Sequence, residues 1–473
     1  MLFPLVRGVL ARSRSLIGVH SRFNSCLFAV TLAVRAGMLL ILYNLLLPLF
    51  LVVSLPVYLR RMIRRGGYAR NFFQRFGIFS RRLRSELGQG DWTWVRAVSV
   101  GEVLVALRLI EEIRRQDPSF RAVISTTTST GYQLALDRAS EWDRVIYSPI
   151  DSYPLLPRIW RLMRPRAVIL IDSDLWPSFL AIAHQQNTPV FLANARLSPR
   201  SEARYLRFKQ LAKPLFWDRL TAVLSQDHHD AERWSRLGLR PDQIVLTGSI
   251  KYDTADIPAN LRFVDWLKDQ GIDSSRPCLL GGSLHTGEEE LLITVFRVLR
   301  AKFADLFVIL VPRHFERTPE VEKILRERSI SYSLRSQPDF TAAPDVLIVD
   351  STGELNDWYQ TASVVVIGKS FLGFGGQNPV EPLLARKPVI CGPHMENFKF
   401  LVEELVREKG ILQLAAGSAL EPAIEHLLVN QKAASEMVAN ADRVLAQHRG
   451  AAARAAAYVL QRMRTSGNEQ ERA

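Results

Sequence analysis

From about Trp92 onward, short apolar runs alternate with stretches of helical period. The first series of apolar runs is TWVRAV, RAVIST, RVIYSPI, AVILID, PVFLANA, TAVLSQ and IVLTGS. A second series, starting near Pro277, is PCLLGGS, LFVILVP, DVLIVD, SVVVIG and PVICGP. Apolar strands separated by helices are typical of a parallel sheet covered on both faces. The pattern predicts an α/β protein of two Rossmann-like, doubly wound domains that face each other across a cleft.

The boundaries of these domains follow from shifts in composition. We predict a first domain over residues 66–250 and a second over residues 277–430. Residues 251–276 are polar and punctuated by proline, as expected of an inter-domain connection. Residues 431–473 begin with an Ala-rich stretch and are predicted to form C-terminal helices and a tail.

A membrane anchor is predicted before the first domain, within residues 36–65. Residues 36–58 form an uncharged run that is long enough to cross a hydrocarbon core of about 30 Å. No small-residue cleavage site follows the run, which argues against a cleaved signal peptide. Pro48 and Pro56 leave open whether the segment spans the bilayer or lies in its interface.

Basic residues flank the apolar run on both sides. The flank that follows it contains Arg60, Arg61, Arg64 and Arg65, which by the positive-inside tendency hold the downstream domains in the cytoplasm. Residues 1–35 form a basic extension to which we assign no role.

Composition narrows the class of partner. The 473 residues carry a net charge of +14, which points to an anionic partner. The basic residues are scattered and form no platform with aromatic residues, so we expect no nucleic acid. The three cysteines are widely spaced, which argues against a disulfide framework or a zinc site.

The ends of the apolar runs carry polar motifs, and ligands bind at the carboxyl ends of such strands. After SVVVIG, a loop with Gly373, Gly375 and Gly376 leads to a helix that carries Glu381. Bare backbone beside a helix N-terminus suits a phosphate, and a carboxylate suits ribose hydroxyls. The plainer interpretation is a tight strand-to-helix turn.

The motifs together resemble one family. The order and spacing of SVGE, DLWP, NARLS, GSIKYD, LVPRH, TGEL and GGQNPVEP are similar to those of the Kdo transferases of Gram-negative bacteria. These are membrane-anchored GT-B glycosyltransferases, which move 3-deoxy-D-manno-octulosonic acid (Kdo) from CMP-Kdo onto a lipid A precursor. The resemblance runs from the hydrophobic segment to the C-terminal helices. It implies an enzyme at the bacterial inner membrane, with catalytic domains on the cytoplasmic side.

The resemblance also implies catalytic residues. Glu102 matches the family's general base, although a carboxylate that stabilises a helix N-terminus is the plainer interpretation. Lys251 matches a position that stabilises charge in the transition state, and an exposed loop lysine is its plainer interpretation. Asp172 is the third catalytic residue that the resemblance implies, and it stands where the family commonly has Glu.

A CMP site is implied in the second domain. Its predicted residues are Pro312, Arg313, Thr352, Gly353, Glu354, Asn378, Pro379, Val380 and Glu381. Gly375, Gly376 and Gln377 are predicted to form a donor loop, in which Gln377 stands where the family usually has His.

Asp172 and Asp174 also spell the DxD pattern that other glycosyltransferases use to hold a metal. CMP leaves with one phosphate, which cations and helix N-termini can neutralise. We therefore predict no metal and no cofactor. The expected partners are CMP-Kdo, a lipid A precursor and a membrane with anionic head groups.

Two alternatives from other classes stay open at this point. One is another GT-B enzyme, a transferase or an epimerase that uses a different nucleotide sugar. The other is a non-catalytic membrane protein that binds anionic lipid.

Overall fold

The computed structural model describes residues 37–54, 71–253, 260–273, 275–340 and 343–471. The predicted extension at residues 1–35 and the four arginines of the basic flank lie outside these ranges. The chain divides into two compact units, residues 1–253 with 450–473 and residues 254–449.

Unit 1 is built on a parallel sheet of seven strands in the order β3-β2-β1-β4-β5-β6-β7. Its strands are β1 (Thr93–Arg96), β2 (Ala122–Thr126), β3 (Arg144–Tyr147), β4 (Ala167–Ile171), β5 (Val190–Ala195), β6 (Ala222–Ser225) and β7 (Ile244–Leu246). Each coincides with one of the predicted apolar runs. The strand order reverses between β1 and β4, which pair in register from Thr93↔Ala167 to Arg96↔Leu170. In a doubly wound sheet such a reversal marks the position where ligands bind.

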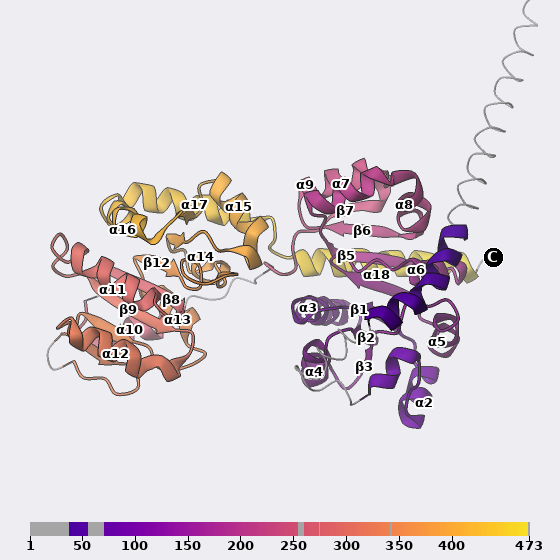
Figure 1. The fold of residues 1–473 in the computed structure, drawn as a ribbon, viewed down its shortest axis with the longest axis horizontal. Coiled ribbons are helices and arrows are strands. Elements are labelled where there is room, and N and C mark those ends of the chain that lie inside the picture. Colours follow the sequence, from indigo (N-terminus) through magenta and orange to yellow (C-terminus); the bar gives the residue numbers. More distant parts are fainter. Residues whose placement is uncertain (1–36, 55–70, 254–259, 274, 341–342, 472–473) are drawn as a thin grey trace, which may run out of the picture. The chain divides into compact units, whose positions relative to one another are not determined.

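Helices cover both faces of this sheet (Figure 1). They are α2 (Arg81–Gln89), α3 (Val100–Gln116), α4 (Ser129–Arg138), α5 (Leu156–Met163), α6 (Pro177–Gln185), α7 (Pro199–Arg207), α8 (Lys209–Leu215), α9 (His228–Arg236) and α18 (Ala451–Glu471). Successive strand residues point to opposite faces. Val95 therefore belongs to the core beneath α3, α4 and α18, whereas Trp94 packs on Trp160 of α5 and Phe179 of α6.

Unit 2 repeats the architecture with the order β10-β11-β9-β8-β12-β13-β14, again all parallel. Its strands are β8 (Cys278–Leu284), β9 (Phe307–Pro312), β10 (Tyr332–Leu334), β11 (Val346–Ile348), β12 (Val364–Ile367), β13 (Val389–Cys391) and β14 (Leu412–Gln413). Here the order reverses between β8 and β12. The two sheets confirm the predicted pair of doubly wound parallel sheets.

The helices of unit 2 follow the same alternation with the strands. They are α10 (Arg262–Asp269), α11 (Glu288–Leu299), α12 (Thr318–Glu327), α13 (Leu355–Trp358), α14 (Val380–Leu384), α15 (Lys399–Arg407), α16 (Leu420–Val429) and α17 (Gln431–Ala446). Helices α11, α12, α16 and α17 share one hydrophobic core with the strands.

The division of the chain differs from the predicted one at the C-terminus. Residues 431–473 do not form one segment, because α17 belongs to unit 2 and α18 returns to unit 1. Ala451, Ala455 and Val459 of α18 are fully buried in the core that α3 also lines. Small side chains allow the two helices to approach closely, so the Ala-rich composition reflects packing. Helix α10 lies within residues 251–276, which were predicted as the connection, but it belongs to unit 2.

The predicted apolar segment is helical over Gly37–Ser54, the described part of the run, and is drawn in indigo in Figure 1. Its length and composition are those of a helix that can cross a membrane. Pro48 does not break it.

Candidate active site

Glu102 lies at the reversal of strand order in unit 1. Strand β1 ends at Arg96, and Ser99 caps the following helix α3 by accepting a hydrogen bond from the Glu102 amide at 3.4 Å. The Glu102 carboxylate reaches back and accepts hydrogen bonds from the Val98 amide at 2.7 Å and the Ser99 hydroxyl at 3.0 Å. These reciprocal hydrogen bonds fix the carboxylate at the carboxyl end of β1.

The environment of Glu102 changes its acidity. Burial raises its pKa to about 7, against the hydrogen bond from Val98, and the negative charge of Asp172 adds to the rise. A carboxylate with this pKa is partly ionised at neutral pH and can take up a proton there. A solvated glutamate, with a pKa near about 4.3, holds a proton too weakly for that exchange.

Asp172 and Asp174 follow β4, the strand beside β1, and differ in their surroundings. Asp172 has a left-handed backbone (φ 60°) and accepts a hydrogen bond from the Asn194 side chain at 2.6 Å. Burial raises its pKa, opposed by that hydrogen bond and by the charges of Arg196 and Lys251. Asp174 is instead buried in an ion pair with Arg96 at 2.9 Å and accepts a hydrogen bond from the Trp176 indole. Asp174 is therefore engaged within unit 1, and the catalytic role of Asp172 stays a prediction.

Lys251 follows β7 and remains accessible to solvent. Desolvation of its ammonium group lowers its pKa, Asp172 opposes the change and Arg196 adds to it. Asn194 links the two loops, because its side-chain oxygen accepts a hydrogen bond from the Ile250 amide at 2.9 Å while its nitrogen donates to Asp172. Unit 1 therefore brings Glu102, Asp172 and Lys251 into one electrostatic cluster.

Asn194 and Arg196 are members of this cluster that the sequence analysis did not single out. Asn194 lies at a break in register between β5 and β6 and has a φ of 54°. Such bulges redirect side chains, often next to active sites. The sequence pattern that could have identified both residues is the motif NARLS, because it lies at the end of an apolar strand.

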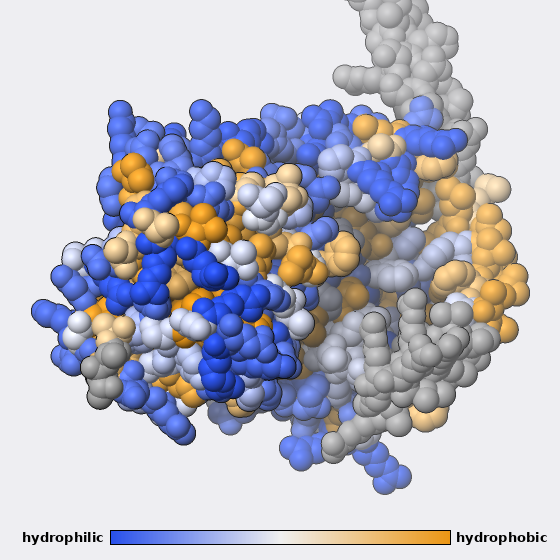
Figure 2. Space-filling model, turned by 60° about the vertical axis from the view of Figure 1, so that its left-hand side comes forward, coloured by the Kyte–Doolittle hydropathy of each residue, from blue (hydrophilic) through white to orange (hydrophobic). Residues whose placement is uncertain are grey.

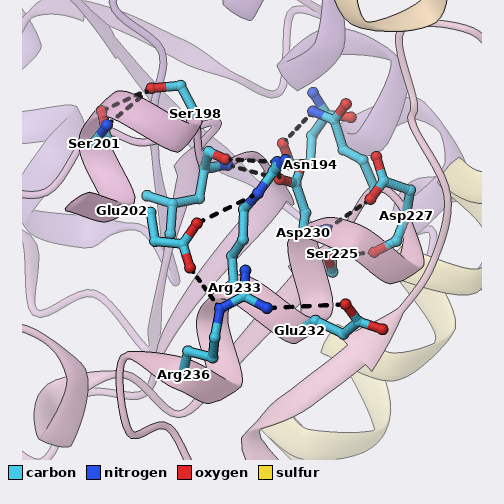
Figure 3. Close-up of polar contacts among 12 residues, drawn as sticks. Asn194, Ser198, Ser201, Glu202, Ser225, Asp227, Asp230, Glu232, Arg233 and Arg236 are labelled. Carbon is cyan, nitrogen blue, oxygen red and sulfur yellow. Dashed lines mark hydrogen bonds and ion pairs between the residues drawn. The ribbon is translucent and has the colours of Figure 1, made fainter. Parts of the chain in front are cut away.

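Helix α9 holds the loop that carries Arg196, and Figure 3 shows Arg233 and Arg236 of α9 beside Glu202 of α7. The Leu197 amide donates to Asp230 at 3.2 Å, and the Leu197 carbonyl accepts from Arg233 at 3.0 Å. Arg233 and Arg236 also pair with Glu202 of α7, at 3.6 and 2.6 Å. Burial raises the pKa of Asp230 to about 6, and the ion pair with Arg233 opposes that rise. These contacts fix the loop from both of its neighbouring helices.

In unit 2, Asn378 and Glu381 form a small polar turn at the start of α14. Asn378 accepts a hydrogen bond from the Val380 amide at 3.1 Å and donates one to Glu381 at 3.0 Å. Burial raises the pKa of Glu381, and the positive charge of Arg313 opposes the rise. Arg313 is exposed after Pro312, the last residue of β9. The predicted residues from β9 and α14 therefore lie within electrostatic range of one another.

The third predicted CMP segment, Thr352 to Glu354, precedes α13. Thr352 and Gly353 are exposed, and Gly353 has a left-handed φ of 82°. Glu354 is engaged with two cations, Arg262 and Arg335, each at 3.6 Å. This carboxylate therefore already has partners within unit 2.

The glycine loop after β12 is organised by a carboxylate that the sequence analysis passed over. Glu288, the first residue of α11, is 2% exposed. It accepts hydrogen bonds from the amides of Lys369 at 2.6 Å, Ser370 at 3.0 Å and Phe371 at 3.0 Å. These amides point at a side chain inside the protein and are not available to a phosphate.

The predicted donor loop itself is also internally bonded. The Gly375 amide donates to Glu396 at 2.6 Å, and the amides of Gly376 and Gln377 donate to Lys369 and Gly368 carbonyls. The Gln377 side chain lies 3.1 Å from His285. The amides of these three residues are thus bonded within the turn, and the assignment of Gly375, Gly376 and Gln377 to a donor loop stays a prediction.

Comparison with known proteins decides the family. The family model described as 3-deoxy-D-manno-octulosonic-acid transferase (kdotransferase) matches residues 70–254. The 3-deoxy-D-manno-octulosonic acid transferase of Haemophilus influenzae is 32% identical over 394 residues, which cover 82% of this chain and 90% of that protein. This chain belongs to the Kdo transferase family. The Kdo transferase of Chlamydophila psittaci is 29% identical over 382 residues, which cover 80% of this chain and 85% of that protein.

The family confirms the resemblance seen in the motifs. This Kdo transferase is a glycosyltransferase of lipopolysaccharide biosynthesis, which excludes the non-catalytic alternative. Its fold is GT-B and is similar to that of the UDP-GlcNAc 2-epimerase from Neisseria meningitidis bound to UDP-GlcNAc. That structure aligns with a TM-score of 0.51 over 79% of this chain and 100% of its own, at 14% identity. A likeness at this identity concerns the fold alone. The roles of the individual site residues stay predictions.

Proposed function

We propose that this Kdo transferase moves Kdo from CMP-Kdo onto a hydroxyl of a lipid A precursor, with inversion at the anomeric carbon. The observation that carries the proposal is Glu102, whose pKa of about 7 lies at the working pH of a cytoplasmic base. The acceptor oxygen forms a bond to the anomeric carbon and gives its proton to Glu102. The bond from that carbon to the CMP phosphate breaks, and CMP leaves with the electron pair.

The cations of unit 1 would balance charge during this transfer. Kdo carries a carboxylate, and the departing CMP phosphate gains negative charge. Lys251 and Arg196 lie within electrostatic range of Asp172 and present positive charge in the same cluster as Glu102. Preorganised charge of this kind is usually the largest single contribution to catalysis. Asp172 in turn keeps Glu102 basic through its negative charge.

In unit 2, we assign CMP to the residues around Arg313, Asn378 and Glu381. The guanidinium group of Arg313 suits the phosphate, because it can donate two parallel hydrogen bonds. Glu381 suits the ribose hydroxyls, since a half-buried carboxylate accepts hydrogen bonds from both. We place the enzyme at the inner membrane with both units on the cytoplasmic side.

A transfer assay with a matched control tests the proposal. Purified enzyme is given preformed CMP-Kdo and a tetraacylated lipid A precursor, and the product is detected by its gain in mass. Glu102→Gln should bind CMP normally in calorimetry and lose 10²–10⁴-fold in turnover, the order of magnitude for loss of a general base. Glu111→Gln, on the same helix in an exposed pair with Arg115, should stay active. Near-normal turnover of Glu102→Gln would assign the base elsewhere, and absence of product with the unaltered enzyme would reject the substrates.

A further inference from the structure

The apolar helix Gly37–Ser54 has two different faces. Leu40, Tyr43, Asn44 and Leu47 are partly covered by protein and recur at the spacing of one helical face. The opposite face carries Leu42, Leu45, Leu49 and Val53, which are 51%, 70%, 61% and 70% exposed. In the rotated view of Figure 2, this helix lies at the right-hand edge, where a strip of hydrophobic surface is visible.

Asn44 attaches the covered face to the catalytic unit. Its side-chain nitrogen donates to the Ser178 hydroxyl at 2.9 Å, and its oxygen accepts a hydrogen bond from the Tyr153 amide at 2.7 Å. Ser178 is fully buried in the first turn of α6. Asp151 holds the same turn by accepting from the Ser178 and Phe179 amides at 3.1 and 2.8 Å. The helix therefore contacts a buried, hydrogen-bonded turn of unit 1 through the side-chain amide of Asn44, near its middle.

This attachment conflicts with a spanning orientation. Asn44 lies seven residues after Gly37, which is about 10 Å along the helix at 1.5 Å per residue. If the helix crossed the bilayer, the α6 start and the neighbouring α5 would enter the hydrocarbon with it. Helix α5 exposes Arg158 and Arg161 close to Tyr153 in sequence. A charged side chain in that medium costs about 2.5–3.5 kcal/mol or more.

We propose that the Gly37–Ser54 helix is a monotopic element, docked on unit 1 through Asn44 and inserted into one leaflet by its opposite face. The occupant of that face is the acyl region of the membrane, because the face is continuous, uncharged and as long as the helix. The proposal deepens the proposed function, since it rests on the enzyme acting at a membrane.

Docking also orients the catalytic cluster. Helix α6 begins directly after the loop that carries Asp172 and Asp174, so Ser178 lies four residues beyond Asp174. Trp176 in that loop is 40% exposed, and tryptophan is favoured at the membrane interface. The monotopic helix thus holds the Asp172 loop at the bilayer surface, where a lipid acceptor presents its sugar hydroxyls.

Labelling of the two helix ends tests the topology without measuring activity. In a Cys26→Ser background, the remaining cysteines, Cys278 and Cys391, are buried. Gly37→Cys and Ser54→Cys are exposed separately to a membrane-impermeant maleimide, in spheroplasts and in inverted inner-membrane vesicles. Both should react only in inverted vesicles. Reaction from opposite sides, or protection of either end on both sides, would overturn the proposal. Reaction of both ends only in spheroplasts would reject the cytoplasmic location and leave the monotopic helix intact.

A second pair of variants tests the docking. Asn44→Leu should keep the protein in the membrane fraction and lower transfer to acceptor in vesicles at least tenfold, with transfer to detergent-dispersed acceptor nearly unchanged. Ser54→Leu, at the end of the same helix, should leave both rates unchanged. Equal rates for Asn44→Leu and the unaltered enzyme in vesicles would reject docking through Asn44.

A label on the exposed face identifies what covers it. Leu45→Cys carrying an environment-sensitive dye should shift to the blue when phosphatidylglycerol vesicles are added. Efficient disulfide linkage of two Leu45→Cys chains in membranes would instead show that a second copy covers the face, and would overturn the lipid assignment.

Discussion

At the scale of single residues, the pKa of Glu102 links catalysis to stability. A carboxyl group whose pKa is higher in the folded than in the unfolded protein favours folding below its unfolded pKa. That contribution is lost as the pH rises from about 4.5 to about 7, because the folded state must then bury a charge. Above about pH 7, Glu102 is ionised in the folded protein, and folding bears the full free-energy cost of burying that charge. If Glu102 is the proposed base, its active form therefore carries a charge that destabilises the folded protein.

We expect Glu102→Gln to be more stable than the unaltered enzyme at pH 8, by about 1 to 3 kcal/mol, since one pKa unit corresponds to about 1.4 kcal/mol. Glutamine has no charge to bury and can still accept the hydrogen bond from Val98. The gain should shrink toward zero at pH 4.5. Denaturant unfolding at the two pH values measures it, with Glu111→Gln as the control that should show no such difference.

The same pKa predicts the pH dependence of the reaction. The deprotonated form of Glu102 is the active one, so kcat/KM should rise with pH and level off above about pH 7. A profile already flat from pH 5 would be incompatible with Glu102 as the base. The profile is measured with preformed donor, which separates transfer from donor synthesis.

The buried Arg96–Asp174 pair bears on the metal question. The two side chains are only 3% and 4% exposed, and breaking a buried pair by removing a partner costs about 3–5 kcal/mol. Asp174 would have to leave Arg96 to bind a metal. We expect transfer from preformed CMP-Kdo to continue in excess EDTA. Loss of activity in EDTA with recovery on addition of Mg²⁺ would make Asp172 a candidate ligand.

At the scale of elements, the two units use a carboxylate in the same place. Glu102 follows β1 and Glu288 follows β8, and each strand adjoins the reversal of strand order in its sheet. Glu102 faces other charged groups and solvent, whereas Glu288 is enclosed by backbone amides of the β12 loop. One position carries the proposed general base, and the other holds a loop through its hydrogen bonds.

Removing the Glu288 carboxylate should disorganise the donor loop. In Glu288→Ala the amides of Lys369, Ser370 and Phe371 lose their acceptor, and each buried unsatisfied group costs about 1–3 kcal/mol. We expect a lower Tm and at least a tenfold loss of CMP affinity in calorimetry. Glu290→Ala, an exposed residue on the same helix, is the control. Unchanged CMP affinity in Glu288→Ala would show that the loop does not contribute to CMP binding.

The strands were largely predictable because buried parallel strands are apolar runs. All seven strands of unit 1 and five of unit 2 coincide with predicted runs. The two strands not foreseen, β10 and β14, have three and two residues at the edges of their sheet. Their sequences, YSL and LQ, contain polar residues and so form no apolar run, whereas the equally short β7, β11 and β13 are apolar throughout.

The site was predictable only where a motif identified it. Glu102, Asp172 and Lys251 came from the family resemblance, and the structure brings them together. Arg96 lies 78 positions before Asp174, and no local pattern relates them. Glu288 is one of three successive glutamates, and their sequence does not say that Glu288 and Glu289 are buried while Glu290 is exposed.

At the scale of the whole molecule, unit 1 depends on the last segment of the chain. The Asp253 carboxylate accepts hydrogen bonds from the Gly450 and Ala452 amides, both at 2.8 Å, and α18 then completes the core against α3. Unit 2 is a continuous stretch with a core of its own.

Deleting residues 450–473 should therefore unfold unit 1 and leave unit 2 folded. Helix α18 buries six core side chains, and its removal exposes their binding surface on α3. Residues 254–449 expressed alone should be soluble, show cooperative thermal unfolding and bind CMP. A truncated enzyme with normal Tm and activity would show that α18 is dispensable, and an insoluble fragment would show that unit 2 needs its neighbour.

Unit 2 is topologically an insertion into unit 1, because residues 254–449 lie between the two segments of unit 1. The Gly450 amide donates to the Asp253 carboxylate at 2.8 Å, so the two ends of the insertion are joined by a hydrogen bond. A single recombination event can replace residues 254–449 as one cassette, while every strand and helix of unit 1 keeps its connections. In such a gene, the half that would recognise a nucleotide can evolve separately from the half that would meet the lipid.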